Sequence, residues 1–183
     1  MSDTKRRVLE ALFTTFGDVH IRLLARITSL HPNTVIAALD ELESEELIVR
    51  IPDERTQRIL VRPGRYFAIR KTAYTIESLH RSGLIDALND AFSYPTIILF
   101  GSYARGENHE RSDLDLFIIS DVKRGFDASA YECFGEIHLF VHTPEEFEKL
   151  RKSSAQLISN VLNGIIISGY VEWSGSKRSS KET

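Results

Sequence analysis

Cysteine, long apolar runs and an excess of positive charge are what this 183-residue sequence lacks. Cys133 is its single cysteine, so no disulfide can form within the chain, which favours a reducing compartment. No apolar run approaches the roughly 20 residues that a membrane-spanning helix needs. The polar residues 1–7 are not followed by an apolar signal region. We therefore expect a soluble, cytoplasmic protein that does not associate with a membrane.

The formal net charge of −3 excludes a surface that is positively charged throughout. Any contact with nucleic acid must therefore come from a local basic patch. The apolar fraction of 42% is ordinary for a globular chain, and the length fits one large domain or two small ones.

The first third of the sequence predicts three helices followed by a hairpin. Apolar residues recur at helical spacing in three segments, 5–16, 21–29 and 35–47. Asn33 or Thr34 is expected to cap the third helix. Two β-rich runs then flank a polar turn, at 47–51 and 58–61. This order of elements resembles a winged helix-turn-helix domain.

One later stretch, residues 97–120, carries the chemistry. An apolar run ends in Gly101 and Ser102, ten residues follow, and Asp113 and Asp115 stand at the head of a second apolar run. Side chains alternate along a strand, so both carboxylates point the same way, about 7 Å apart. Such a pair suits divalent cations, because Mg²⁺ prefers carboxylate and phosphate oxygens.

The Gly-Ser, ten residues, Asp-x-Asp spacing resembles the minimal nucleotidyltransferases of the DNA polymerase β superfamily. The resemblance implies an enzyme that uses Mg²⁺ or Mn²⁺ and moves a nucleoside monophosphate, with AMP from ATP expected, to a hydroxyl of a protein or small molecule. Asp113 and Asp115 are then catalytic residues and metal ligands. Gly101, Ser102 and Arg105 are the expected nucleotide-binding residues, because they can approach or contact the phosphates.

The superfamily pattern also includes a third carboxylate on the next core strand, shortly before a segment like residues 143–146. At the matching position this sequence has His138. Glu136 lies two residues earlier on the same strand face, about 7 Å away along the strand. It is our candidate for the third catalytic acid. His138 as a base or metal ligand, and a site that binds nucleotide without efficient turnover, are the alternatives.

The predicted fold class is α+β. We place the winged helix at 1–65, a connecting helix at 66–82 and a nucleotidyltransferase α/β domain with a small mixed sheet at 83–173. Residues 174–183 form a polar tail without apolar anchors, which predicts disorder.

If the winged helix binds DNA, the N-terminal end of its third helix enters the major groove. His31, Asn33 and Thr34 are then the base-contacting residues, and Arg55 and Arg58 of the wing contact phosphates. Basic and acidic residues number ten each over this region, and five acids gather toward the C-terminal half of the third helix. Dimerisation or partner docking is therefore the alternative role, with a homodimer as one form.

Two functional hypotheses result. The first is the nucleotidyltransferase described above, with the winged helix binding DNA or a partner. The second is a DNA-binding transcriptional regulator whose degenerate nucleotidyltransferase domain senses a nucleotide. Minimal nucleotidyltransferases also act as antitoxins that adenylate a toxin, so the resemblance implies a HEPN-class toxin as a candidate protein partner in a toxin–antitoxin pair.

Overall fold

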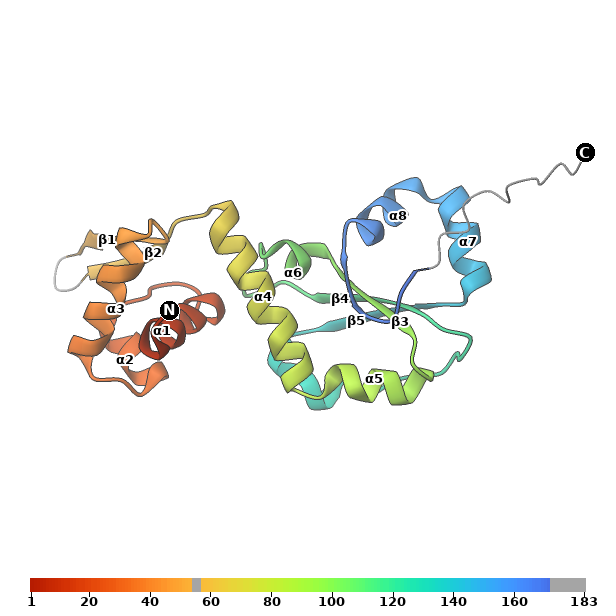
Figure 1. Cartoon of the computed structure of the whole chain (residues 1–183), viewed down its shortest axis with the longest axis horizontal. Helices are drawn as coiled ribbons and strands as arrows, with labels where there is room; N and C mark the ends of the chain where they lie inside the picture. Colours follow the sequence, from red (N-terminus) through yellow and green to blue (C-terminus); the bar gives the residue numbers. More distant parts are fainter. Residues whose placement is uncertain (54–56, 172–183) are drawn as a thin grey trace, which may run out of the picture.

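The computed structural model describes residues 1–53 and 57–171. The first elements in the chain are α1 (Asp3–Thr14), α2 (Ile21–Thr28), α3 (Pro32–Ser44), β1 (Ile48–Pro52) and β2 (Gln57–Val61). β1 and β2 pair antiparallel. Helices α1 to α3 and this hairpin together form one end of the elongated molecule (Figure 1). Three helices followed by a hairpin is the order that the hydrophobic periodicity predicts. The proposed tail at 174–183 lies outside the described residues.

His31, and not Asn33 or Thr34, caps α3. Its ring Nδ1 accepts a hydrogen bond of 3.3 Å from the backbone N–H of Asn33. Pro32 occupies the first helical position, where a missing N–H leaves no intrahelical hydrogen bond unmade. The predicted cap was wrong because Pro32 starts the helix, which places both Asn33 and Thr34 inside the first turn.

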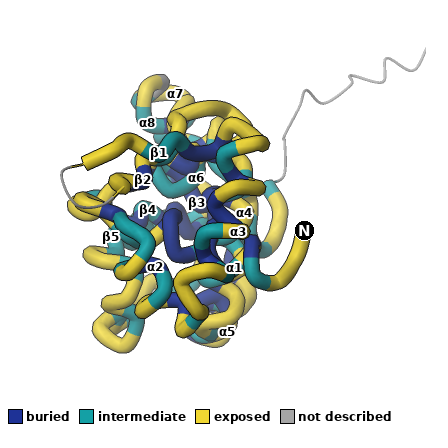
Figure 2. The backbone as a smooth tube through the Cα atoms, turned by 90° about the vertical axis from the view of Figure 1, so that its left-hand side faces the viewer, coloured by how far each residue is buried: buried dark blue, intermediate teal, exposed yellow. Residues whose placement is uncertain are grey.

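Helices α1 to α3 and the hairpin enclose a first hydrophobic core (Figure 2). Its most buried members are Val8, Leu9, Leu12, Leu24, Val35, Leu39, Leu42 and Ile48. They repeat at three- and four-residue spacing in the helices, as expected of one apolar face per helix.

Helix α4 (Arg65–Arg81) joins this part to the rest of the chain (Figure 1). Near its start, Phe67 packs edge-on against Phe13 of α1, with ring centroids 5.1 Å apart. Near its end, Leu79 is fully buried in a second core together with α5 (Leu84–Phe92). One helix therefore contributes to both cores.

A four-stranded sheet organises the second half. Its strands are β3 (Thr96–Phe100), β4 (Leu114–Ile119), β5 (Ile137–His142) and β6 (Ile165–Ser168). The order is β5-β4-β3-β6, with β4 and β5 parallel and the other pairs antiparallel. The predicted small mixed sheet and α+β class are thus confirmed.

Alternation along β4 assigns its side chains to two layers. Leu114 and Leu116 face the core shared with α4 and α5. Phe117 faces the opposite core, beside α7 (Pro144–Ser153) and α8 (Ala155–Leu162). Because side chains two residues apart share a face, Asp115 lies on the side of α7 and α8.

Local signals explain the start of α7. The Thr143 hydroxyl accepts from the backbone N–H of Glu146, and the Glu146 carboxylate accepts from the backbone N–H of Thr143. This capping box satisfies two donors that a helix start leaves open. The residue types at 143–146 are therefore sufficient to start the helix.

Two short helices complete the structure: α6 (Gly101–Arg105) and the 3₁₀ helix η1 (Ser129–Phe134). The sequence between residues 121 and 130 showed no clear period, and η1 overlaps its end. Among the helices of the described ranges, none combines the length and apolar character needed to cross a membrane.

Candidate active site

The backbone between β3 and α6 approaches a carboxylate on β4. Phe100, the last residue of β3, pairs with Asp115 in the antiparallel ladder, and Gly101 follows it. Gly101 has a φ of +73°, and a Cβ atom on it would lie 2.4 Å from Oδ2 of Asp115. Only glycine fits both the left-handed backbone and this close approach. The turn therefore brings the start of α6 directly against the Asp115 carboxylate.

His138 stands beside Asp115 across the sheet. The two residues are register partners of the parallel strands β5 and β4. His138 Nδ1 lies 3.5 Å from Oδ1 of Asp115, and His138 Nε2 lies 3.2 Å from Oε1 of Glu136. The imidazole thus sits between two carboxylates. Glu136 precedes β5, and its largely exposed side chain reaches His138.

The electrostatics of the three groups are linked. Burial raises the pKa of the Asp115 carboxyl, and the nearby Asp113 charge raises it further, while His138 opposes the change. The hydrogen bond to Glu136 is the main cause that raises the pKa of His138, with smaller contributions from Asp113 and Asp115. Neighbouring carboxylates therefore favour the protonated imidazole.

Asp113 lies one residue before β4 and is partly buried. Its charge acts on Asp115, His138 and the Tyr103 phenol, so it belongs to the same cluster. Two hard carboxylates of one strand end suit a divalent cation. No set of three His, Cys, Asp or Glu side chains in residues 1–53 and 57–171 is arranged to hold a metal alone. The other ligands of a cation held by these two carboxylates would be water or substrate oxygens.

Ser102 and Arg105, the other predicted phosphate-binding residues, have different surroundings. Ser102 follows Gly101 in α6, next to the carboxylate cluster. Arg105, at the end of the same helix, points its Nε to Glu107, 2.7 Å away, at the protein surface. Ser102 is therefore next in sequence to the glycine that approaches Asp115, whereas the guanidinium of Arg105 pairs with a neighbouring acid.

Residues 81–164 match the family model of the nucleotidyltransferase domain. The match includes every residue of the carboxylate cluster described above. It leaves out α1 to α3 and the hairpin.

A second comparison points the same way. A 72-residue stretch is 36% identical to a Methanocaldococcus jannaschii protein named "Putative protein adenylyltransferase MJ1379". The stretch spans 39% of this chain and 63% of that relative, less than two thirds of its length. A solved structure titled as RV1404 from Mycobacterium tuberculosis is similar at 21% identity, over 61% of this chain and 78% of that one, with a TM-score of 0.37. A TM-score of this size does not establish a shared fold.

The predicted DNA-contacting residues lie before the nucleotidyltransferase domain. His31 and Asn33 are exposed at the N-terminal end of α3, and Thr34 is partly exposed. Arg58 on β2 pairs with Asp18 at 2.6 Å and keeps about half of its side chain exposed. Arg55 lies outside the described residues. The structure thus places the three α3 residues together and Arg58 on the hairpin.

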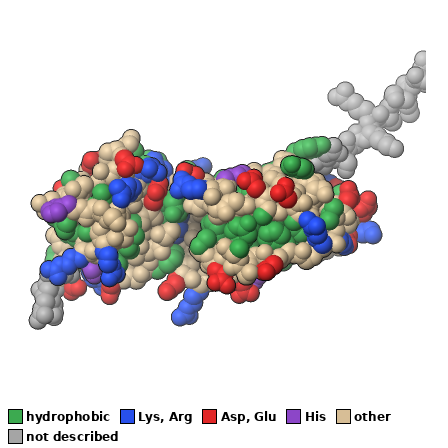
Figure 3. Space-filling view, turned by 90° about the horizontal axis from the view of Figure 1, so that it is seen from below, with side chains coloured by type: hydrophobic (Ala, Val, Ile, Leu, Met, Phe, Trp, Pro, Cys, Tyr) green, Lys and Arg blue, Asp and Glu red, His purple; other side chains and the backbone are tan. Residues whose placement is uncertain are grey.

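Acids of α3 neutralise part of the neighbouring basic cluster. Arg50 bonds both Glu43 and Asp40, with its Nη2 atom 2.7 Å from Asp40 Oδ1, and Arg62 lies 4.0 Å from Glu46. Basic and acidic side chains are also interspersed on the N-terminal part in Figure 3. Arg50 therefore adds little free positive charge to this face.

Sequence reasoning missed two buried polar residues, Lys71 and Asn108. Lys71 is 6% exposed on α4, and Asn108 is 8% exposed in the loop after α6. The sequence offered one signal, for Lys71: this lysine lies on the face of α4 that also carries Phe67 and Thr75, both of which are buried.

Proposed function

We propose that the chain is a nucleotidyltransferase that moves AMP from ATP to a hydroxyl of a protein or small molecule, with Mg²⁺ or Mn²⁺. The observation that carries the proposal is the close approach of the Gly101 turn to Asp115, with Asp113 beside it. A backbone free of Cβ beside the Asp115 carboxylate leaves room for the phosphates of a nucleotide, and two neighbouring carboxylates can hold the cation that such a transfer uses. The nucleotidyltransferase match supports it.

The residues present fit a divalent cation. Asp113 and Asp115 would hold it, and the phosphates of the nucleotide would complete its shell, which is how Mg²⁺ is usually bound with one or two carboxylates. When bound, the cation neutralises charge on the phosphates. Burial of Asp115 disfavours its lone negative charge, which favours an added cation.

We assign His138 as the general base rather than Glu136. Its Nε2–H donates to Glu136, so the neutral ring presents the Nδ1 lone pair on the side of Asp115. The acceptor hydroxyl gives its proton to Nδ1, its oxygen bonds the α-phosphorus, and the bond to pyrophosphate breaks. Glu136 orients the ring. The Ser102 hydroxyl donates to a phosphate oxygen in this proposal.

The test is transfer of label from α-labelled ATP to a cell lysate and to the purified chain. We expect transfer by the native protein and its loss in Asp113→Asn. Glu110→Gln is the matched control, because it removes an exposed acid from the preceding loop without touching the cluster. Absence of label, or equal labelling by the Asp113 variant, contradicts the proposal.

A protein acceptor is the more specific proposal, and a HEPN-class toxin encoded beside the chain is its first candidate. The name of the Methanocaldococcus relative supports a protein acceptor. Mass spectrometry of a co-expressed neighbouring toxin should show an added AMP, and an unmodified toxin contradicts this acceptor.

We also propose that residues 1–65 form a winged helix that binds DNA, either to position the enzyme or to regulate its gene, as a regulator with a nucleotide-sensing domain would. The supporting observation is the exposed N-terminal end of α3 beside a hairpin that carries Arg58. A salt-sensitive shift of the chain's own promoter DNA is expected.

A double substitution of Arg55 and Arg58 to Gln should abolish that shift. Arg124→Gln together with Lys152→Gln is the charge-matched control, since both residues are exposed and lie in the second half of the chain. No DNA affinity at low salt would leave dimerisation as the alternative, and the mass of the chain in solution would then show a homodimer.

A further inference from the structure

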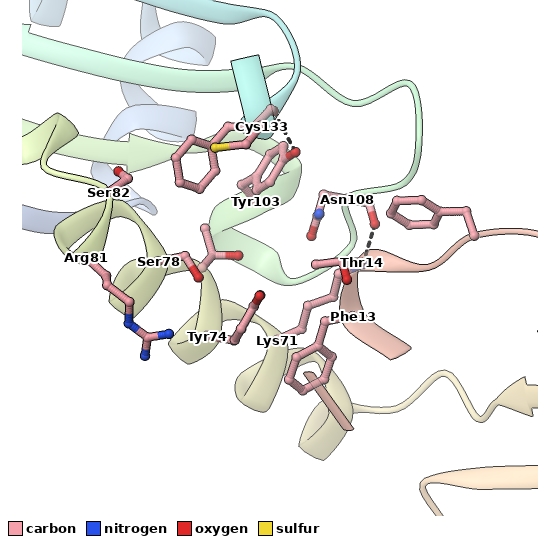
Figure 4. A pocket seen from close by; sticks show the side chains of 13 residues that line it. Phe13, Thr14, Lys71, Tyr74, Ser78, Arg81, Ser82, Tyr103, Asn108 and Cys133 are labelled. Carbon is pink, nitrogen blue, oxygen red and sulfur yellow. Dashed lines mark hydrogen bonds between the residues drawn. The ribbon is translucent and has the colours of Figure 1, made fainter. Parts of the chain in front are cut away.

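A second cavity lies on the face of the sheet opposite to Asp115. It has a volume of about 480 Å³, within the range of small-molecule sites. Its walls come from α1, α4, α6, the loop after α6 and η1 (Figure 4). Tyr103 and Phe134 in its wall pack on the core of α4 and α5, whereas Asp115 faces α7 and α8. The cavity therefore lies on the other face of the sheet from Asp115, with the charge of Asp113 acting on Tyr103 in its wall.

Lys71 places a buried amino group at this cavity. Its Nζ donates to the backbone carbonyl of Asn108 at 2.5 Å and lies 5.3 Å from the ring centroid of Phe16, which also lines the cavity. No ion pair of Lys71 with an acid exists within the described ranges. Burial lowers its pKa. Because a buried charge is normally paired, this amino group points to an anion.

Asn108 provides an unpaired hydrogen-bond acceptor beside Lys71. Its Oδ1 atom is buried and has no hydrogen-bond partner among the residues that the structure describes. Nearly all buried polar atoms in proteins are paired, so an open one at a cavity wall indicates a missing donor. The backbone and side-chain oxygens of one asparagine lie within about 5 Å of each other by covalent geometry. A ligand that serves both Lys71 and Oδ1 must therefore carry its anion and its donor close together.

We propose that this cavity binds a free α-amino acid with an apolar side chain. The carboxylate contacts Lys71 Nζ, the ammonium group donates to Asn108 Oδ1, and the side chain packs on aromatic residues that line the cavity. These are Phe13, Phe16, Tyr74 and Phe134. An α-amino acid holds its two charged groups on one carbon, so it can present a carboxylate and an ammonium group to two neighbouring protein groups.

The cavity lies where two parts of the chain meet. Its walls belong both to α1 and to η1, and η1 is followed after Gly135 by Glu136, which contacts His138. An amino acid bound here contacts both parts of the chain.

The test compares three probes by calorimetry on the full chain: L-phenylalanine, 3-phenylpropionate, which lacks the amine, and phenethylamine, which lacks the carboxylate. L-phenylalanine should bind about tenfold or more tightly than either analogue, since each loses one charged hydrogen bond. In Lys71→Met, L-phenylalanine and phenethylamine should bind equally. In Asn108→Leu, L-phenylalanine and 3-phenylpropionate should bind equally.

Thermal unfolding is a second measurement that can be made even if a substitution lowers the stability of the chain. Millimolar L-phenylalanine should raise the melting temperature of the native chain more than phenethylamine does, whereas the two should raise that of Lys71→Met equally. Equal stabilisation of the native chain by the two probes would overturn the proposal.

Cys133 offers an independent readout without any substitution at Lys71 or Asn108. It is exposed, lines the cavity and is the chain's single cysteine. Millimolar L-phenylalanine should slow its alkylation by a thiol reagent, and phenethylamine should do so less. Failure of all three probes to bind or to protect Cys133 overturns the proposal, as does binding that is unchanged in both variants.

Discussion

Oδ2 of Asp115 lies 2.4 Å from the place that a Cβ atom on Gly101 would occupy. Phe100 and Asp115 are ladder partners, so the register of β3 and β4 fixes this approach. The glycine is therefore required by the neighbouring carboxylate as well as by its own left-handed backbone. The turn and the acid act as one unit of the site.

Gly101→Ala should reduce adenylate transfer by about a hundredfold, because a methyl group at this place displaces the Asp115 carboxylate by about 1 Å. Label transfer from ATP measures the effect. Gly125→Ala is the control, since a Cβ there meets nothing within 4 Å and Gly125 lies outside the site. Full activity of the Gly101 variant would show that Asp115 does not need its observed position.

Gly106→Ala should destabilise the fold rather than act on the chemistry directly. Its φ is +66°, and a Cβ there would lie 2.2 Å from the backbone oxygen of Ala68 on α4. Backbone strain of about 1–3 kcal/mol adds to this clash. Denaturant unfolding should therefore show a lower free energy of unfolding than for Gly125→Ala. An unchanged midpoint would mean that α4 does not hold this close contact in solution.

Adenylate transfer should rise with pH through the pKa of His138. The hydrogen bond to Glu136 raises that pKa, so the ring stays protonated to a higher pH than a free histidine and becomes a base only above it. Glu136→Gln removes the carboxylate charge and should move the rising limb to lower pH. The measurement is label transfer across the pH range, with His80→Gln, on exposed α4 surface, as the control.

A pH profile that is flat, or one that is unmoved in Glu136→Gln, would contradict the assignment of His138 as the base. Activity of His138→Gln equal to that of the native chain would contradict it as well. Glu136 would then regain its place as the candidate third acid.

Most of the helices and strands could be predicted from local signals in the sequence, namely hydrophobic periodicity and capping residues. The three N-terminal helices and the hairpin follow in the predicted order, and α7 begins at the cap that Thr143 and Pro144 indicate. Such signals lie within one turn of the chain, so the sequence alone displays them. The cap of α3 was missed because His31 is an unusual capping residue, although Pro32 beside it marked the helix start.

The site was predictable in part. The spacing of Gly101 and Asp115 identified their neighbourhood, but the contact of His138 with Asp115 depends on the register of two strands more than twenty residues apart in sequence. The pairing of Arg105 with Glu107 and the cavity at Lys71 depend on side-chain conformations and packing in the folded chain. No periodicity encodes these contacts.

Asp115→Asn should raise the melting temperature while it abolishes adenylate transfer. Burial raises the pKa of Asp115 in the folded chain, so above its unfolded pKa the charged form weakens folding, and this cost shrinks as pH falls through the folded pKa. Asn keeps the shape without the charge.

Asp127→Asn is the contrasting control. The Asp127 carboxylate accepts from the backbone N–H of Ser129 at 3.0 Å, which lowers its pKa and favours the charged form, so that variant should melt lower. Thermal unfolding at neutral pH and again at acidic pH measures both, and the gain from Asp115→Asn should diminish at the lower pH. A lower melting temperature for Asp115→Asn would mean that its contact with His138 outweighs the cost of burial.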